Sequence, residues 1–127
     1  MRGYHPLYAV IEGTGDIVHS RLRGGNANSG RGAATFLAET FNRVRAAGAT
    51  GPLTLRADSG FYAGAVATAC REAQVKYSIT VKQNPAIRTA IAKIDDKAWT
   101  PIPYFLDGAD VAETTYRPFG TNAPLCA

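Results

Sequence analysis

The chain has 127 residues, of which 46% are hydrophobic and 19% charged, a size and composition that fit one globular domain and exclude a disordered segment. Its net charge of +4 permits a nucleic-acid partner without requiring one. Cys70 and Cys126 form no C-x-x-C motif, so a disulfide framework or a zinc site is not expected. No apolar run approaches the ~20 residues of a membrane span, and the first residues do not resemble a secretory signal. We therefore expect a cytoplasmic protein.

Two β-rich runs open the chain, residues 8–12 and 17–23, and the short glycine-bearing connection between them predicts an antiparallel hairpin. Residues 24–32 follow as a loop of small and polar residues, whose backbone amides have room to approach a phosphate. The loop is not a P-loop, because Arg31 and Gly32 stand where that motif requires lysine and then serine or threonine. A flexible connection between a strand and a helix is the alternative, and the composition favours it.

Residues 33–47 carry apolar side chains at helical spacing, among them Phe36 and Phe41, and this spacing predicts a helix with its aromatic residues in the core. Glu39 and Arg43 lie one turn apart on the outer side of that helix, where we expect them to pair. Gly48 marks the end of the helix.

The central stretch, residues 53–62, alternates apolar and polar side chains up to Asp58 and then passes into an alanine-rich helical pattern. This pattern predicts a strand that ends in a carboxylate, followed by a helix with Cys70 on its buried face. A second alternating run, residues 75–82, predicts a parallel strand, so that the two strands and the helix form a βαβ unit. Asp58 then either lies at the carboxyl edge of the sheet, where ligands gather, or caps the helix through its side-chain oxygen.

The last third of the chain begins with Asn84 and Pro85, which are typical of a helix start, and isoleucines continue that helix to about Asp95. Two prolines interrupt residues 99–104, which suits an edge strand or a loop, and residues 111–116 suit one more strand. The expected fold is therefore α/β: a mixed sheet, made of an antiparallel hairpin and a parallel βαβ unit, with helices on both faces.

Few side chains are arranged for chemistry. Ser59 lacks the G-x-S-x-G context of a nucleophile elbow, and His5 and His19 lie on separate elements without the spacing of a metalloprotease site. Asp58, the glycine-rich loop and the basic residues around them remain. One carboxylate is too few to hold two Mg²⁺ ions ~4 Å apart, so these residues alone indicate only an α/β domain with a candidate acidic site.

Three segments together resemble the DDE transposases of bacterial insertion sequences: Gly3-Tyr4-His5-Pro6-Leu7, Leu22-Arg23-Gly24-Gly25-Asn26-Ala27 and Leu55-Arg56-Ala57-Asp58-Ser59-Gly60-Phe61-Tyr62. The third segment matches the R-x-D-S-G-F strand end that one group of these transposases carries. The resemblance runs in one register from Gly3 to about Phe119 and includes the strand that begins at Val75 and the Trp99-Thr100 segment.

The resemblance implies an RNase H-like fold that cuts and joins DNA by in-line attack on phosphodiesters, with two Mg²⁺ ions held by three carboxylates. The second carboxylate matches Asp58, whereas no residue of the chain matches the first Asp or the final Glu. We therefore expect a partial catalytic core in residues 1–97, the start of a β-rich insertion in residues 98–127, and a chain that is inactive alone. The implied partners are transposon-end and target DNA, together with the remainder of a transposase or further copies of the chain.

The resemblance also assigns roles to individual residues. Asp58 is the expected metal ligand, and Asn26 and its loop are expected near the mouth of the active site. Arg23, Arg31 and Arg56 become candidate phosphate contacts, with a salt bridge from Arg56 to Asp58 or another carboxylate as the alternative. Two other functions remain open: a non-catalytic DNA-binding or interaction module on this scaffold, and a small metal-dependent nuclease.

Overall fold

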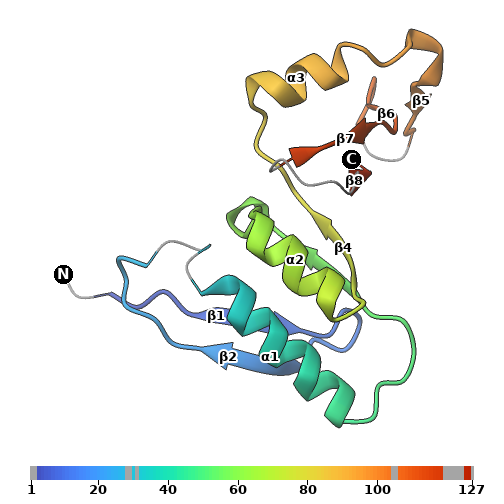
Figure 1. Ribbon diagram of the computed structural model, residues 1–127. Helices are drawn as coiled ribbons and strands as arrows, with labels where there is room; N and C mark the ends of the chain where they lie inside the picture. The colour runs from blue at the N-terminus through green and yellow to red at the C-terminus, as the bar shows by residue number, and fades with distance from the viewer. Residues whose placement is uncertain (1–2, 28–29, 31, 104–105, 119–124, 127) are drawn as a thin grey trace. The chain divides into compact units, whose positions relative to one another are not determined.

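A computed structural model of the chain describes residues 3–27, 30, 32–103, 106–118 and 125–126 (Figure 1). The chain divides into two compact units, Met1–Val81 and Lys82–Ala127, which we call the N-terminal and C-terminal units. The N-terminal unit contains strands β1 to β4 and helices α1 and α2, and the C-terminal unit contains helix α3 and the short strands β5 to β8. Each unit is described separately.

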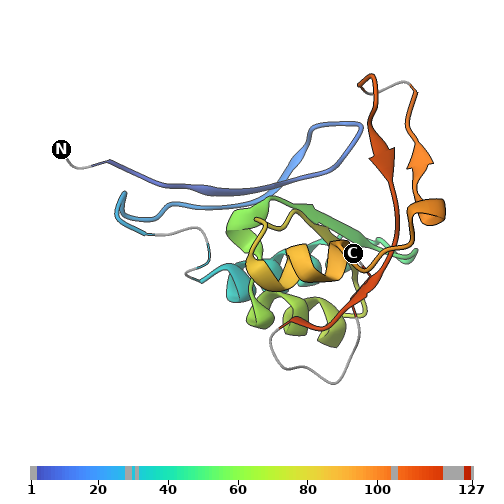
Figure 2. The same cartoon turned by 90° about the horizontal axis from the view of Figure 1, so that it is seen from above.

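The predicted hairpin is confirmed. Strand β1 (Leu7–Val10) pairs antiparallel with β2 (Ile17–Arg21), with Leu7 opposite Arg21 and an irregularity between Ala9 and Val10. The two strands lie side by side in Figure 2. The connection turns at two glycines with positive φ, 95° at Gly13 and 76° at Gly15, a backbone conformation that glycine adopts at little cost.

Helix α1 (Ala33–Ala46) follows the loop and supplies most of the core. It begins after Gly32, whose φ of 72° is left-handed, and it places Phe36 at 1% exposure and Phe41 at 6%. Around them pack buried residues from β1, from α2 and from the position just before β4, namely Leu7, Val66, Cys70 and Val75. The predicted helix with its aromatic residues in the core is therefore confirmed, and its buried face forms the centre of the N-terminal unit.

The parallel βαβ unit is also confirmed. Strand β3 (Thr54–Ala57) pairs with β4 (Lys76–Ile79) in parallel, with Thr54 opposite Lys76, and helix α2 (Gly64–Glu72) connects them. Cys70 is fully buried on α2 and has no disulfide partner among the described residues, as expected of a small buried hydrophobe. Burial raises the pKa of its thiol to about 11.

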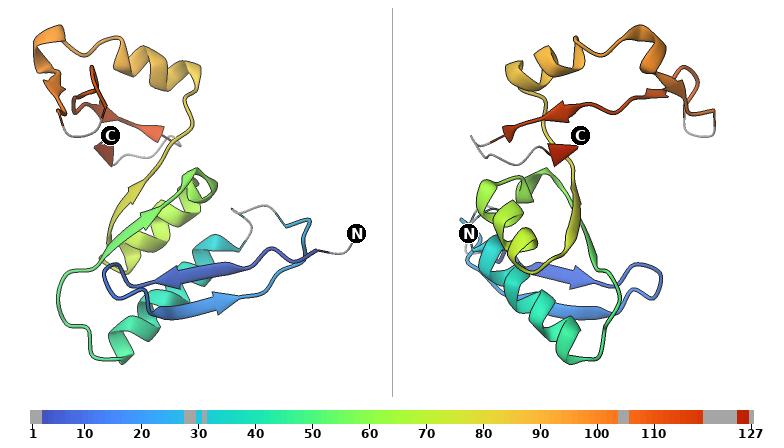
Figure 3. Two further views of the ribbon diagram at one scale, coloured as in Figure 1. Left: turned by 180° about the vertical axis from the view of Figure 1, so that it is seen from behind. Right: turned by 45° about the vertical axis from the view of Figure 1, so that its right-hand side comes forward.

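Two features of the expected sheet differ in the structure. In the part of the chain that the structure describes, the strands pair only in twos, so β1–β2 and β3–β4 remain separate sheets instead of joining into one mixed sheet. Helices α1 and α2 pack against each other and lie on the same face of the N-terminal strands, rather than on both faces (Figure 3). The physical reason is the shared core, in which Phe36 of α1 and Cys70 of α2 belong to one apolar cluster.

The C-terminal unit begins with helix α3 (Pro85–Ile91), where the Asn84 side chain accepts a hydrogen bond from the Ile87 amide at 3.0 Å, as the predicted N-cap requires. The helix ends earlier than expected, and Asp95 instead caps a short 3₁₀ turn, Asp96–Ala98. Strand β5 (Thr100–Pro101) pairs with β6 (Asp110–Val111), and β7 (Thr115–Tyr116) pairs with β8 (Leu125–Cys126), both antiparallel. No helix in the described ranges is long and apolar enough to cross a membrane.

Candidate acidic site and its surroundings

Asp58 lies immediately after β3, at the carboxyl end of the parallel strand pair, where its alternating sequence placed it. Its Oδ1 accepts a hydrogen bond from the Gly60 amide at 2.8 Å and thereby caps a 3₁₀ turn, Ser59–Phe61. The capping role that the sequence left open is therefore present, on a 3₁₀ turn that precedes the long helix. The carboxylate is exposed, and its Oδ2 makes no hydrogen bond with any described residue.

Arg56, two residues earlier on β3, forms an ion pair with Glu12, which follows β1: Nη1 of Arg56 lies 3.1 Å from Oε1 of Glu12. This is the salt bridge to another carboxylate that the sequence allowed as the alternative to phosphate binding. The two side chains are 74% and 80% exposed, so solvent screens the pair and it adds at most about 1 kcal/mol to stability. An exposed guanidinium held this weakly is available to an incoming anion.

An apolar groove of about 710 Å³ runs between β1 and β3 in the N-terminal unit. One wall is Tyr8–Glu12, the other is Leu53–Asp58, and side chains of α1 form the floor. Of the predicted site residues that the structure describes, Arg56 and Asp58 line this groove, whereas Arg23 and Asn26 do not. The groove therefore brings together part of the predicted site.

The loop after β2 is fastened to the segment that precedes β1. The Gly25 amide donates to the Gly3 carbonyl at 2.8 Å, and the His5 ring nitrogen Nδ1 lies 2.7 Å from the Ala27 carbonyl oxygen. Gly25 is required there, since a Cβ atom would lie 2.6 Å from the Gly3 oxygen. Over residues 24–27 the predicted flexible connection is thus a docked turn.

The other candidate phosphate contacts belong to this loop or adjoin it. Arg23 donates from Nε to the His5 carbonyl at 3.1 Å, so part of its guanidinium holds the base of the hairpin. Asn26 is exposed within the turn. Arg31 lies outside the described residues. The contacts of Arg23 with His5 give it a structural role that the sequence did not predict.

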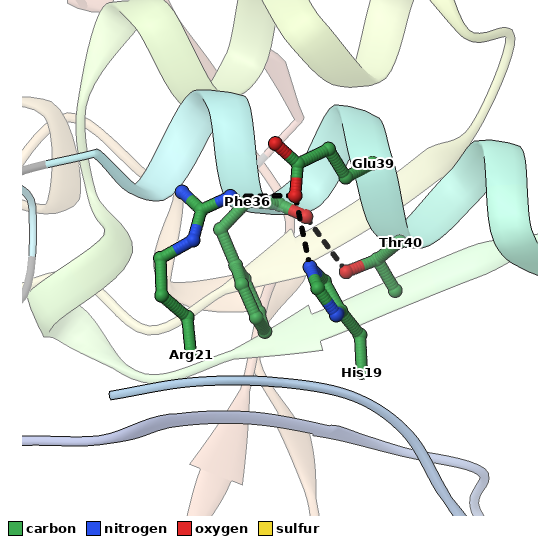
Figure 4. Close-up of polar contacts among 5 residues, drawn as sticks. All are labelled: His19, Arg21, Phe36, Glu39 and Thr40. Atoms are coloured by element: carbon green, nitrogen blue, oxygen red, sulfur yellow. Dashed lines mark hydrogen bonds and ion pairs between the residues drawn. The ribbon is translucent and has the colours of Figure 1, made fainter. Parts of the chain in front are cut away.

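A polar cluster on the inner face of β2 was missed by the sequence analysis (Figure 4). The Glu39 carboxylate accepts hydrogen bonds from Arg21 and contacts His19 Nε2 at 3.1 Å, while the His19 ring stacks on Phe36 with 4.5 Å between centroids. The predicted pairing of Glu39 with Arg43 is wrong, because Glu39 turns toward β2 instead. These hydrogen bonds, first from Arg21 and then from His19, lower the pKa of the Glu39 carboxyl.

The described residues do not fit a metal centre by themselves. Among them, no group of three or more His, Cys, Asp or Glu side chains is close enough together to hold a metal ion. A two-metal site needs several oxygen ligands, and β3 delivers one carboxylate. The end of β3 therefore carries one exposed carboxylate, Asp58, and one exposed guanidinium, Arg56, two residues apart.

The chain was compared with models of protein families. The model described as "Transposase DDE domain group 1" matches residues 1–117. No curated protein and no solved structure matches the chain.

Proposed function

Because the chain belongs to the transposase DDE domain group 1 family, we propose that it is part of a catalytic domain that cleaves and joins DNA strands. The observation that carries the proposal is the family match over residues 1–117, which covers the N-terminal unit and most of the C-terminal unit. An RNase H-like arrangement is the fold we propose for the complete catalytic domain. In support, the N-terminal unit combines an antiparallel hairpin, α1 and a parallel βαβ unit in one α/β arrangement.

Asp58 is the residue that we propose as the carboxylate ligand of the family's divalent metal, with Mg²⁺ as the ion. In support, it lies at the carboxyl end of a parallel strand, the edge where α/β proteins bind ligands. Its cap fixes one oxygen and leaves Oδ2 exposed for a second interaction. Since β3 delivers one carboxylate where two metal ions require several, we propose that this chain alone does not cleave DNA, and that other polypeptide segments supply the missing ligands.

DNA is the proposed partner, and the charge distribution supports it. Residues 1–81 hold nine Lys and Arg against five Asp and Glu, whereas residues 82–127 hold five of each, so the whole net charge of +4 belongs to the N-terminal unit. We propose Arg56 as a phosphate contact, because its guanidinium is exposed, two residues before Asp58, and is held by a surface ion pair with Glu12. Arg23, Asn26 and Arg31 remain proposed DNA contacts on the strength of the resemblance.

Titration of the purified chain with Mn²⁺ or Mg²⁺, followed by calorimetry, tests the role of Asp58. The matched variant is Asp58→Asn, since asparagine also caps turns and removes only the charge. We expect weak binding, with a dissociation constant above about 1 mM for a single carboxylate, and a further loss in Asp58→Asn. Tight binding that disappears in the variant would refute the proposed inactivity and would support a small metal-dependent nuclease.

Fluorescence anisotropy with a labelled DNA duplex tests the partner. We expect affinity to fall as salt rises, and Arg56→Gln to reduce the salt-dependence slope by about one, as loss of one phosphate contact does. Arg71→Gln is the control, because Arg71 is also exposed in the N-terminal unit and its guanidinium donates to the Thr68 hydroxyl at 3.1 Å. Equal losses in both variants would show general attraction and would exclude a specific role for Arg56.

A further inference from the structure

The docked turn after β2, residues 24–27, is fastened to the segment that precedes β1. The His5 amide donates to the Arg23 carbonyl at 3.0 Å, and the Gly25 amide donates to the Gly3 carbonyl at 2.8 Å. These two bonds flank an antiparallel bridge and continue the pairing of β1 and β2 beyond the strands. The Arg23 side chain adds a third bond, from Nε to the His5 carbonyl at 3.1 Å. All three bonds end at or before Gly25.

The His5 side chain carries the fastening two residues further. Its Nδ1 lies 2.7 Å from the Ala27 carbonyl oxygen, in a partly buried position. Because a carbonyl oxygen only accepts hydrogen bonds, Nδ1 must carry the proton and donate it. Ala27 in turn donates its own amide to the Gly24 carbonyl at 3.0 Å, which closes the turn. The imidazole therefore holds the far end of the turn, beyond the backbone bond at Gly25.

Close contacts give the turn a defined shape. A Cβ atom on Gly25 would lie 2.6 Å from the Gly3 oxygen, so the turn and the segment before β1 touch through their backbones. A Cβ atom on Gly24 would lie 3.2 Å from Oδ1 of Asn26, which places the Asn26 side chain over the Gly24 backbone. The position of Asn26 therefore depends on how the turn is docked.

Asn26 has hydrogen-bond donors to offer. It is exposed, and neither its backbone amide nor its side-chain amide makes a hydrogen bond with another described residue. The turn itself carries no charged side chain, and residues 17–38 contain three arginines and no Asp or Glu. An oxyanion that approaches Asn26 thus meets donors, and no acidic side chain of the same stretch repels it.

The turn lies at the same end of the N-terminal unit as Asp58. Strand β2 leads through the turn into α1, and β3 leads past Asp58 into α2. Helices α1 and α2 pack against each other and begin at the same end of the unit (Figures 1 and 3). Asn26 and Asp58 are therefore carried on two loops at one end of the unit.

We propose that His5 is a positioning residue for DNA: its Nδ1 bond to Ala27 holds the turn in the shape that presents the Asn26 donors to a backbone phosphate. The inference rests on the proposed function, because it requires DNA to be the partner. His5 itself does not touch the DNA. It raises affinity because a turn that is already ordered loses little freedom when a phosphate binds.

A merely structural role for His5 leads to a different result. If the Nδ1 bond served only stability, its loss would lower the urea unfolding midpoint and leave the DNA affinity of the folded chain unchanged. The contact at Asn26 also differs from the one proposed for Arg56. Asn26 offers neutral donors that neutralise no phosphate charge, so losing its contact lowers affinity at every salt concentration without changing the salt slope.

Two variants of His5 separate these roles. The Asn side chain places its amide nitrogen at the position of the histidine Nδ1, whereas Gln places its amide nitrogen near the position of Nε2. The test titrates the whole 127-residue chain into a labelled DNA duplex, followed by fluorescence anisotropy at several salt concentrations. We expect His5→Gln to weaken binding about two- to tenfold with an unchanged salt slope, and His5→Asn to bind like wild type.

Asn26→Ala tests the contact without touching the fastening of the turn. We expect it to weaken binding by a factor similar to that of His5→Gln, again with an unchanged slope. Asn42→Ala is the matched control, since Asn42 is an exposed asparagine of α1, and it is expected to bind like wild type. Urea unfolding of each variant establishes that the chain is folded under the conditions of the titration.

The outcomes distinguish this inference from the function on which it rests. Wild-type affinity in His5→Gln or Asn26→Ala, or failure of His5→Asn to restore binding, would overturn the positioning role. A smaller salt slope in His5→Gln would also overturn it, because a displaced charge such as that of Arg23 would then explain the loss. If the wild-type chain itself showed no salt-dependent binding, the proposed DNA partner would fail, and this inference with it.

Discussion

Truncation of Phe36 to alanine tests whether α1 is the centre of the N-terminal unit. The ring is 1% exposed and lies in the apolar cluster shared by β1, α1, α2 and β4. On its other side it stacks with His19, at 4.5 Å between centroids, and the Arg21 guanidinium carbon lies 5.7 Å from its centre. One side chain thus joins the hairpin to the helices, and its removal is expected to destabilise both.

The magnitude follows from these contacts. Replacing a buried phenylalanine by alanine costs about 3–5 kcal/mol through lost transfer energy and the cavity left behind. That range already includes most of the stacking with His19, which is worth about 1 kcal/mol by itself. Phe36→Leu preserves most of the volume and removes the ring, so we expect it to cost about 1–2 kcal/mol. With a urea dependence of about 1.5 kcal/mol per molar, Phe36→Ala lowers the unfolding midpoint by about 2–3 M.

Urea unfolding followed by circular dichroism at neutral pH measures these differences. Leu106→Ala is the control, because that leucine is 65% exposed and its truncation is expected to change stability by less than about 0.5 kcal/mol. A cost below about 1.5 kcal/mol for Phe36→Ala would refute the reasoning, since it would mean that the hairpin does not pack on α1. Equal losses in Phe36→Leu and Phe36→Ala would instead assign the stabilisation to the aromatic ring alone.

Three further predictions concern single side chains. Hydrogen bonds from Arg21 and His19 lower the pKa of Glu39, so the stability that its carboxylate contributes is present above the usual pKa of 4.5 and is lost as the pH falls below it. Glu39→Gln is therefore expected to weaken the dependence of the urea unfolding midpoint on pH between about pH 3 and pH 5. The same pH dependence in the variant and the wild type would contradict this. Burial raises the pKa of the Cys70 thiol to about 11, so we expect Cys70 to resist a thiol reagent at pH 8 until urea unfolds the chain. Mass spectrometry of the labelled Cys126→Ala protein measures this reaction at Cys70 alone. Rapid labelling of the folded protein would contradict the burial of Cys70. Asn84→Ala removes the cap of α3 and is expected to cost about 1 kcal/mol of local stability, seen as faster amide exchange in α3, whereas Asn84→Asp retains the cap and is expected to behave like wild type.

Local patterns predicted the elements, because alternation and helical spacing report which side of a segment is buried. These patterns correctly predicted the hairpin, helix α1 around Phe36, and the βαβ unit with Cys70 facing inward. The end of α3 was less predictable, because isoleucine spacing continues past Ile91 although the chain turns there and Asp95 starts a new cap. The boundary between a catalytic core and a β-rich insertion at residues 97 and 98 stays a prediction.

Contacts between elements were not predictable, because they depend on how the hairpin docks on α1. Helical spacing places Arg43 one turn after Glu39, and an ion pair at this spacing stabilises a helix by only a few tenths of a kcal/mol. Arg21 and His19 lie on the same face of β2 because they are two residues apart. When β2 packs on α1, the Glu39 carboxylate contacts both side chains. The partner of Arg56 was open for the same reason, since Glu12 comes near only after the hairpin and β3 are placed on one core.

Asp58 shows why a position can follow from sequence while a function does not. The side-chain oxygen of an aspartate at the end of a strand can cap the following turn or bind a metal, so the alternating pattern before Asp58 is compatible with either role. The structure makes the two roles compatible, because Oδ1 is held by the Gly60 amide while Oδ2 makes no hydrogen bond with a described residue. A carboxylate fixed through one oxygen loses less freedom when the other binds a cation, which favours the second role once further ligands are present. Asparagine retains the capping oxygen and removes the charge, so Asp58→Asn, and not Asp58→Ala, separates the ligand from the cap.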